Sequence, residues 1–437
     1  MSLWRIFATV AGVALAARAA HLAIIWNHPL WVLGEFWSKS DMQQFIAWGN
    51  HLASGDWLDR ETFRPYFDWQ RSIAPPEVWN SWFGAHVYYQ PPLYAYLLAS
   101  VLAVTGSLDL FRVGQLVLGA VNCGLIAVLG TRLFNRTAGW VAGLAAACYA
   151  PFIFTDAEIL RGTLTLATQL LVLLAMVSWH RAEPPGERRL WLVLIGGAFG
   201  VAYLADPAMV VFIPFALGWL LVAQRARGKA PAGPARLLAR PALVMAGAMA
   251  ALAPLVARNL AVGAPPLSCT TRGPLAFVMG NAPDAMPAGA TIPASTGRIL
   301  RRSGYAMLPT IRETLRLYAG HYGPLLRQQW FKLRALWSAY EIPDNTSFYY
   351  AARVSPVVRY GLRFSVVASL GLIGLVLALP GVLADPRRLL PVLYLLSSEV
   401  LFVLAHVVSR YRRPMVLALL LFAGYAVAWL AGRRWQA

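Results

Sequence analysis

The chain has 437 residues; 58% of them are hydrophobic, only 13% are charged, and the mean hydropathy is +0.55. Soluble domains carry about 25% charged residues, so this composition excludes an ordinary soluble protein and indicates a membrane protein with several spans. The formal net charge is +19, but many basic residues lie in short loops between apolar runs and no nucleic-acid-binding motif is found, which argues against a nucleic-acid partner.

Ten apolar runs predict an all-α polytopic membrane protein. They lie at residues 6–26, 110–131, 137–155, 162–179, 190–205, 208–223, 241–259, 361–380, 389–406 and 414–431. If the N-terminus is cytoplasmic, every inner loop is basic, whereas the short outer turns at 156–161 and 206–207 hold three acids and one arginine. Because inner loops carry an excess of Lys and Arg, this pattern supports ten spans with both termini inside.

The first run contains a charged residue, Arg18, in its interior. The arginine interrupts what could otherwise be the apolar core of a signal peptide, so we interpret the run as an uncleaved span. A charge inside a membrane span needs a partner or has a function. The sequence does not name the partner.

The first outer segment, residues 27–109, is rich in Trp and Tyr, as expected of a segment at the membrane interface. Its run at 91–105, PPLYAYLLASVLAVT, is apolar but short, and it opens with two prolines. Counting this run as a span would place the later basic loops outside. We therefore predict a helix that lies at the outer interface or dips into it.

Three acids are predicted at the outer face. In the stretch SKSDMQQFIAWGNHL, either Ser40 or Asp41 could cap the amphipathic helix that follows, or the Asp41 carboxylate could serve chemistry. Asp156 and Glu158 lie with Arg161 in the turn FTDAEILRGTL, where helix capping again competes with function. Carboxylates that converge at one surface can provide a general base or hold a divalent cation such as Mg²⁺ or Mn²⁺.

Arginines at the outer ends of spans form a further group. Arg258 closes the seventh span in VARNLAVG, and Arg410, Arg412 and Arg413 open the tenth in SRYRRPM. Two interpretations remain open, namely snorkelling to the interface and binding of a lipid phosphate by the guanidinium forks. The chain thus divides into an N-terminal transmembrane module at 1–259, a small, mostly helical outer segment at 260–360, and C-terminal transmembrane helices at 361–437.

Several stretches, in this order, resemble the GT-C glycosyltransferases, specifically their bacterial protein O-mannosyltransferase-like and aminoarabinose-transferase-like branch. They are SKSDMQQFIAWGNHLASGDW; YYQPPLYAYLLA, which is similar to the family's HPPLY-type helix; the run from LFRVGQLVLG to AEILRGTL; and VARNLAVGAPP, VMGNAP, WFKLRALWSAYEIPDN and SRYRRP. The resemblance implies a GT-C-like fold and an inverting transferase in the bacterial inner membrane. Such an enzyme takes a sugar from a polyprenyl-phosphate carrier, such as undecaprenyl phosphate, at the periplasmic or outer face.

The resemblance also implies roles for particular residues. The family's catalytic acid maps onto Asp41, the proposed general base, and its second acid maps onto Asp156 or Glu158. These three acids would be the ligands if a divalent cation were present, although no cofactor is required. We predict lipid-phosphate binding by Arg258, Arg410 and Arg413, and substrate binding by Tyr88, Tyr89, Gln90 and Arg161. Relatives often have His where this chain has Gln90, so a role that depends on that His does not carry over to this chain.

Aromatic residues of the first outer segment have two interpretations. Trp48, Trp57, Tyr88 and Tyr89 could stack on sugar faces or anchor the segment at the interface. The sugar is not identified, and the acceptor could be a glycan, a glycolipid or a protein. Because the chain is shorter than many relatives, we expect no large C-terminal soluble domain that would bind a peptide acceptor.

Two other functions remain open at this point. A non-catalytic transporter or flippase of lipid-linked sugars would also bind lipid phosphate, but it predicts polar residues deep in several spans. A structural membrane protein would not need Asp41 on the same side as Asp156 and Glu158. The clustering of acids at one face favours an active site at the outer surface.

Overall fold

The structure, a computed structural model, describes residues 2–38, 40–60, 75, 77, 86–226, 234–286, 288–382 and 384–434. Its helices are α1 (Leu3–Ile25), α2 (Pro29–Phe36), α3 (Asp41–Ala53), α6 (Pro92–Thr105), α7 (Leu108–Leu133), α8 (Arg136–Ala147), α9 (Ala150–Asp156), α10 (Gly162–Arg181), α11 (Pro185–Ala205), η1 (Pro207–Phe212), α12 (Ile213–Arg225), α13 (Pro234–Val262), α14 (Arg272–Asn281), α15 (Thr296–Arg302), α16 (Met307–Arg316), α17 (Gly323–Leu336), α18 (Phe348–Val354), α19 (Pro356–Tyr360), α20 (Phe364–Val382), α21 (Pro386–Leu404), η2 (Ser409–Arg412) and α22 (Arg413–Arg434). Strand-type pairing in these residues is limited to an isolated bridge, so the predicted all-α class is confirmed.

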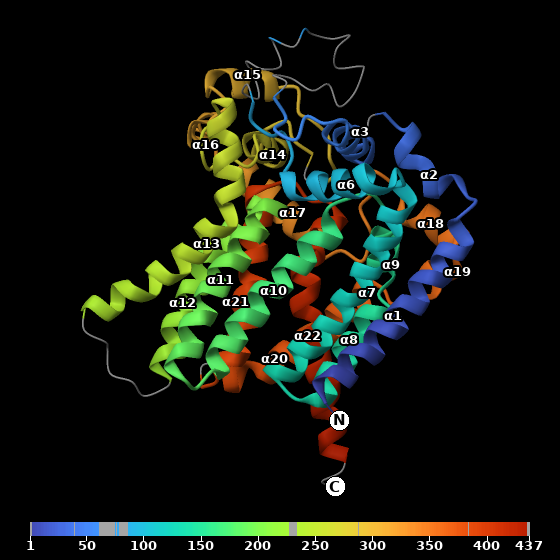
Figure 1. Ribbon diagram of the computed structural model, residues 1–437, viewed down its shortest axis with the longest axis vertical. Coiled ribbons are helices and arrows are strands. Elements are labelled where there is room, and N and C mark those ends of the chain that lie inside the picture. The colour runs from blue at the N-terminus through green and yellow to red at the C-terminus, as the bar shows by residue number, and fades with distance from the viewer. Residues whose placement is uncertain are drawn as a thin grey trace.

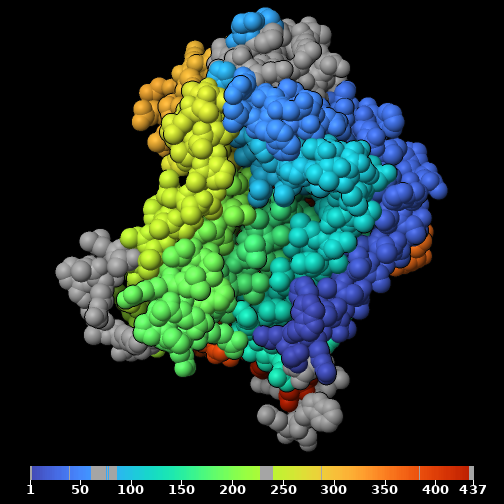
Figure 2. All heavy atoms as spheres, viewed as in Figure 1, coloured from blue at the N-terminus to red at the C-terminus, as the bar shows by residue number. Residues whose placement is uncertain are grey.

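The long helices lie side by side in one bundle (Figure 1). Both chain ends lie at one end of the bundle, and α2, α3, α6, α14, α15 and α16 lie at the opposite end. The space-filling view shows α3 and α6, in blue and cyan, at the surface near that end (Figure 2). The helices at that end come from the two predicted outer segments, 27–109 and 260–360.

Eight segments in the described part of the chain are long and apolar enough to cross a membrane. They are Leu3–Ile25, Leu108–Leu133, Gly162–Arg181, Pro185–Ala205, Pro207–Arg225, Arg240–Val262, Phe364–Val382 and Ser409–Gly432. Each overlaps one of the ten predicted spans. The shorter apolar helix α6 has 14 residues and runs across the end of the bundle (Figure 1). Its predicted place at the membrane interface stays a prediction.

The other two predicted spans take a different form. The run at 137–155 is not one helix but two, α8 and α9, separated at Cys148 and Tyr149. There the chain pairs with Leu362, which accepts a hydrogen bond from the N–H of Ala150 at 2.9 Å and donates one to the carbonyl of Cys148 at 2.8 Å. These bonds satisfy backbone groups that a break in a helix exposes.

The predicted span at 389–406 corresponds to α21, which has 19 residues. It is not among the eight apolar segments, and its sequence carries Arg387, Arg388 and Glu399. It nevertheless packs within the bundle against α12 and α22. In the described part of the chain, the ten predicted spans thus correspond to eight long apolar segments, one broken helix pair and one helix with three charged residues.

Packing between α3 and α6 positions the start of α3. The sequence of α3 places apolar residues at Met42, Phe45, Ile46, Gly49 and Leu52, a spacing that forms one helical face. This face is buried against α6, the turn at 159–160 and α13. The approach is close, because a Cβ at Gly49 would lie 2.7 Å from a carbon of Leu98. The first residue of α3 is thereby held above the bundle.

Candidate active site

A cavity of about 360 Å³ lies between the bundle and the helices at its end, α3, α6 and α14, which form a helical cover (Figure 1). Its walls come from α3, the start of α6, the turn before α10, η1, α14, α21 and η2, so segments far apart in the sequence form it together. Its charged and polar lining residues include Asp41, Gln90, Glu158, Arg161, Asp206, Arg272, His406, Arg410 and Arg413. Apolar lining residues include Phe45, Leu160, Met209, Phe212, Met279, Leu401 and Phe402.

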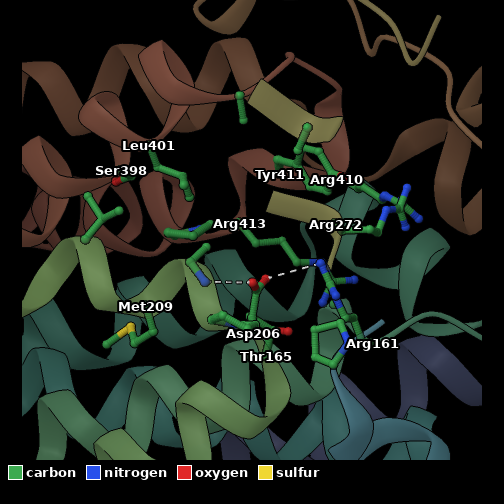
Figure 3. Close-up of a pocket in the computed structure, with 18 of the residues that line it drawn as sticks. Arg161, Thr165, Asp206, Met209, Arg272, Ser398, Leu401, Arg410, Tyr411 and Arg413 are labelled. Carbon is green, nitrogen blue, oxygen red and sulfur yellow. Dashed lines mark hydrogen bonds and ion pairs between the residues drawn. The ribbon is translucent and has the colours of Figure 1, made fainter. Parts of the chain in front are cut away.

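The two kinds of lining gather on different sides. Figure 3 shows Arg161, Arg272 and Arg410 on one side of the cavity and Met209 and Leu401 on the other. A dashed line in the figure joins Arg161 to Asp206, whose charged groups lie 3.7 Å apart. Guanidinium forks are suited to phosphate oxygens, and apolar walls are suited to a hydrocarbon chain. The cavity therefore combines cationic groups on one side with an apolar surface on the other, which suits an amphipathic anion.

Asp41 is the first residue of α3 and lines this cavity. The helix cap is Ser40, whose hydroxyl accepts a hydrogen bond from the N–H of Gln43 at 3.1 Å. The Asp41 carboxylate is therefore available for other contacts. Arg410 donates to one of its oxygens at 2.6 Å, and Arg272 donates to the other at 3.3 Å.

The two arginines determine the charge state of Asp41. Burial alone would raise the pKa of this carboxyl, but the positive charges of Arg272 and Arg410 outweigh that effect and hold the pKa well below its ordinary value. Asp41 is thus ionised at neutral pH. In the same contact, Asp41 raises the pKa of Arg272 against the lowering effect of burial.

Arg272 is a residue that sequence reasoning missed. It begins α14 in the second outer segment, lies 3.3 Å from Asp41 across 231 residues of sequence, and stacks its guanidinium over Tyr89 at 5.4 Å. The stretch TTRGPL has no feature that distinguishes this arginine from the other basic residues of 260–360. Arg272 is recognised as a site residue by its contact with Asp41, and only the tertiary structure shows that contact.

Gln90 and Arg161, both predicted as substrate-binding residues, line the cavity beside Asp41. The Gln90 amide donates to Asp41 at 3.4 Å and to Gln44 at 3.3 Å, and its oxygen accepts from Arg161 at 3.2 Å. Gln90 therefore connects the Asp41 carboxylate to a third arginine. An amide can link an acceptor to a donor in this way because it carries both functions.

Glu158 lines the same cavity, and its carboxylate accepts a hydrogen bond from the hydroxyl of Thr346. Burial raises the pKa of Glu158 to about 7, although the bond from Thr346 acts in the opposite direction. This acid therefore changes its charge near neutral pH. Of the two acids in the turn, Glu158 is the one that faces the cavity.

Asp156 is placed differently. Its side chain is buried and is not part of the cavity lining. Arg18 donates to it through two nitrogens, at 3.0 and 2.6 Å, and Thr163 donates at 2.6 Å. Arg413, which also lines the cavity, contacts its other oxygen at 3.3 Å. The intramembrane Arg18 thus has Asp156 as its partner, and the predicted catalytic role of Asp156 receives no support from its position.

Arg258, predicted to bind lipid phosphate, also lies outside the cavity lining. Its guanidinium donates to the carbonyls of Leu58 at 2.8 Å, Asp59 at 2.7 Å and His86. It also lies over the ring of Tyr88 at 4.1 Å. Because these contacts occupy the guanidinium, Arg258 holds the first outer segment in place, and we leave it out of the anion site.

The aromatic residues predicted to contact sugar are mostly enclosed. Trp48 is completely buried and Tyr88 is 3% exposed, and neither lines the cavity. Tyr89 is also absent from the lining, although its ring lies beside Arg272. Trp57 is 40% exposed but lies outside the cavity. These side chains support the helical cover and do not form the wall that a substrate would touch.

The predicted metal ligands Asp41, Asp156 and Glu158 do not form a suitable set. The first two carboxylates are each paired with two arginines, so a divalent cation between them would be repelled by neighbouring guanidinium groups. In the described part of the chain, the group of acidic and His side chains near enough to share a metal ion is His51, Asp56 and Asp59, outside the cavity lining.

Comparisons with known proteins give a family match and several related folds. The sequence model of the family described as dolichyl-phosphate-mannose-protein mannosyltransferase matches residues 89–257. No curated protein sequence matches the chain. The oligosaccharyltransferase AglB of Archaeoglobus fulgidus, solved with an inhibitory peptide and a dolichol-phosphate, superposes with a TM-score of 0.51 at 13% identity, over 99% of this chain and 50% of that one.

A second solved structure is ArnT of Cupriavidus metallidurans bound to undecaprenyl phosphate. It has a TM-score of 0.50 and 15% identity, and the match covers 97% of this chain and 62% of ArnT. The chain thus spans about half the length of AglB and less than two thirds of ArnT. These findings confirm the resemblance to the GT-C glycosyltransferases at the level of the fold.

Proposed function

We propose that this protein is an inverting glycosyltransferase that moves a sugar from a polyprenyl-phosphate carrier to an acceptor hydroxyl. The observation that carries this proposal is the cavity that joins Asp41 and four arginines, Arg161, Arg272, Arg410 and Arg413, to an apolar wall. The arginines would bind the donor phosphate, and the apolar wall would contact the polyprenyl chain. The fold is shared with proteins solved with dolichol-phosphate and with undecaprenyl phosphate, which supports this donor class.

In this mechanism Asp41 is the general base. Its carboxylate accepts the proton of the acceptor hydroxyl while the hydroxyl oxygen forms a bond to the anomeric carbon. The bond between that carbon and the phosphate oxygen breaks, and polyprenyl phosphate leaves with the bonding electrons. Because attack and departure take place on opposite faces of the sugar, the configuration at the anomeric carbon inverts.

The arginines have a second role, which is to adjust the basicity of Asp41. Without a donor, Arg272 and Arg410 lower the pKa of Asp41, which makes it a weak base. A bound phosphate shares the positive charge of these arginines, so the pKa of Asp41 rises when the donor is in place. Base strength would thereby depend on donor binding. The same arginines would then stabilise the charge that develops on the leaving phosphate.

We place the active site at the periplasmic face of a bacterial inner membrane. The basic loops at the end of the bundle that holds both chain ends support a cytoplasmic location for that end. The cavity lies beneath α3 and α6 at the other end. The partners in this proposal are the lipid-linked donor, the bilayer, and a glycan, glycolipid or protein acceptor.

The test is transfer of labelled sugar from undecaprenyl-phosphate sugars by membranes that contain wild-type protein or Asp41→Asn. Asparagine keeps the size of aspartate but cannot accept the proton, so transfer should fall about 10²- to 10⁴-fold. Asp284→Asn is the matched control, since Asp284 lies in the second outer segment, outside the cavity lining. Wild-type rates in a folded Asp41→Asn protein would exclude Asp41 as the base. A wild-type protein that moves lipid-linked sugars across vesicles without transferring them would instead support the transporter.

A further inference from the structure

The loop between α17 and α18, residues 337–347, meets the candidate site from the second outer segment. Three consecutive residues of this loop contact three different groups of the site. The Asp344 carboxylate lies 2.5 Å from Nε of Arg410, the Asn345 side-chain oxygen accepts from the backbone N–H of Asp41 at 2.8 Å, and Thr346 donates to Glu158. Neither Asp344 nor its neighbours were expected to take part in the site.

This loop is held in place by contacts with η2, the segment that carries Arg410. The N–H of Ile342 donates to the hydroxyl of Ser409 at 2.5 Å. Arg412 donates to the carbonyls of Ala335 at 2.9 Å and Tyr340 at 3.0 Å. The position of Asp344 relative to Arg410 is therefore determined by several independent contacts.

Arg410 lies between two carboxylates. Its Nη2 contacts Asp41 at 2.6 Å and its Nε contacts Asp344 at 2.5 Å. All three side chains are mostly buried, with exposed fractions of 16% to 18%, so the pairs are only weakly screened by solvent. The single positive charge of Arg410 is thus shared between Asp344 and Asp41. Arg410 therefore stabilises the negative charge of Asp41 less than it would if the two formed an isolated pair.

We propose that Asp344 is a positioning residue that acts on Asp41 through Arg410. It holds Nε of Arg410 so that Nη2 points at one oxygen of Asp41, and it takes up part of the guanidinium charge. This inference rests on the proposed function, in which Asp41 is the base and the arginines bind phosphate. Without the Asp344 charge, Arg410 would pair more strongly with Asp41, which weakens the base, and would attract the donor phosphate more strongly.

The experiment compares kcat and donor KM for wild type, Asp344→Asn and Asp284→Asn. For Asp344→Asn we expect kcat to fall about tenfold, as for a base weakened by roughly one to two pKa units, while the donor KM stays unchanged or decreases. Asp344→Glu, which restores the charge, should recover most of kcat. Asp284→Asn should behave as wild type. If Asp344 had a purely structural role, Asp344→Asn would yield less folded protein or a higher donor KM. The proposal is overturned if folded Asp344→Asn has either the kcat of wild type or a raised donor KM.

Binding of undecaprenyl phosphate, followed by intrinsic tryptophan fluorescence, separates this proposal from the proposed function. If wild type binds this lipid but transfers no sugar, the transferase assignment fails, and the binding comparison still tests the charge of Arg410. If Asp344→Asn binds undecaprenyl phosphate as tightly as wild type or more tightly, the result supports the sharing of the Arg410 charge between Asp344 and Asp41. Weaker binding by Asp344→Asn overturns the proposal. If Asp344→Asn does not fold, Asp344→Ser removes the same charge with a smaller side chain.

Discussion

Asp41 and Asp156 are both acids at the outer ends of helices, but their surroundings give them different properties. Asp41 has 18% of its side chain exposed and borders the cavity, whereas Asp156 has 3% exposed and is enclosed by Arg18, Arg413 and Thr163. A carboxylate enclosed by two guanidinium groups stabilises the fold only while both charges remain paired. Removing one partner leaves an uncompensated buried charge.

We therefore predict that Asp156→Asn mainly affects stability. Because Arg18 would remain buried without a counter-charge, the free energy of unfolding should fall by about 3–5 kcal/mol. The measurement is thermal unfolding of purified protein in detergent, together with transfer activity per folded molecule. Asp41→Asn should lose transfer far more strongly, and its loss of stability should be smaller, because Asp344 remains as a partner of Arg410 and Arg272 is 22% exposed. If folded Asp156→Asn had wild-type stability but no transfer, Asp156 would be catalytic after all.

Glu158 leads to a prediction about pH. Burial raises its pKa to about 7, so it is mostly neutral at pH 6 and mostly ionised at pH 8. Ionisation adds a negative charge beside Arg410 and Arg413 and weakens the attraction of the site for phosphate. The donor KM should therefore rise about three- to tenfold between pH 6 and pH 8.

The control for this pH effect is Glu158→Gln, which keeps the shape of the side chain and removes the titration. The donor is a phosphodiester that keeps a single negative charge across this range, so its own ionisation does not contribute. The KM of Glu158→Gln should be low at both pH values. A rise of KM that persists in this variant would assign the titration to another group.

Helices α11 and α13 pack with their backbones close together, and a substitution can test this contact. A Cβ at Gly196 of α11 would collide with the carbonyl oxygen of Val244 in α13, and one at Gly247 of α13 would collide with the carbonyl of Val193. Small residues at such positions let the backbones approach closely, which is a common basis of helix association in membranes. Helix α13 continues to Arg258, which holds the first outer segment.

We predict that Gly196→Ala separates α11 from α13 and destabilises the protein by about 1–3 kcal/mol. Gly218→Ala in α12 is the matched control, because a Cβ there would meet nothing within 4 Å. That variant should be neutral or slightly more stable, since alanine favours a helix over glycine by about 1 kcal/mol. Thermal unfolding of both variants, followed by size-exclusion chromatography, checks the difference. Equal stability of the two variants would contradict the close packing.

At the scale of the whole molecule, the two chain ends and the cavity cover lie at opposite ends of the bundle (Figure 1). With the proposed orientation, green fluorescent protein fused to the C-terminus should fluoresce in a bacterial host, because it folds in the cytoplasm. Alkaline phosphatase fused after residue 290, within the second outer segment, should be active, because it requires the periplasm. Activity of a C-terminal phosphatase fusion would reverse the orientation and place the cavity at the cytoplasmic face.

The all-α membrane class and the approximate positions of the helices could be predicted from the sequence alone, because apolar length and basic loops are local properties of the chain. The sequence also identified Asp41, Gln90, Glu158, Arg161, Arg410 and Arg413 as candidates, and all of these line the cavity. Local patterns could not show that α8 and α9 are separate helices, since the break is satisfied by Leu362, more than 200 residues away.

The pairing of charges depends on the tertiary structure. It joined Arg18 to Asp156, used Arg258 to hold a loop, and brought Arg272 and Asp344 to the site. The Coulomb energy of an ion pair depends on distance and burial, and neither is encoded in the spacing of residues along the chain. Contacts such as Asp41 with Arg410, separated by 369 residues, arise only when the helices pack. Residue types were therefore readable from the sequence, whereas their roles followed from the fold.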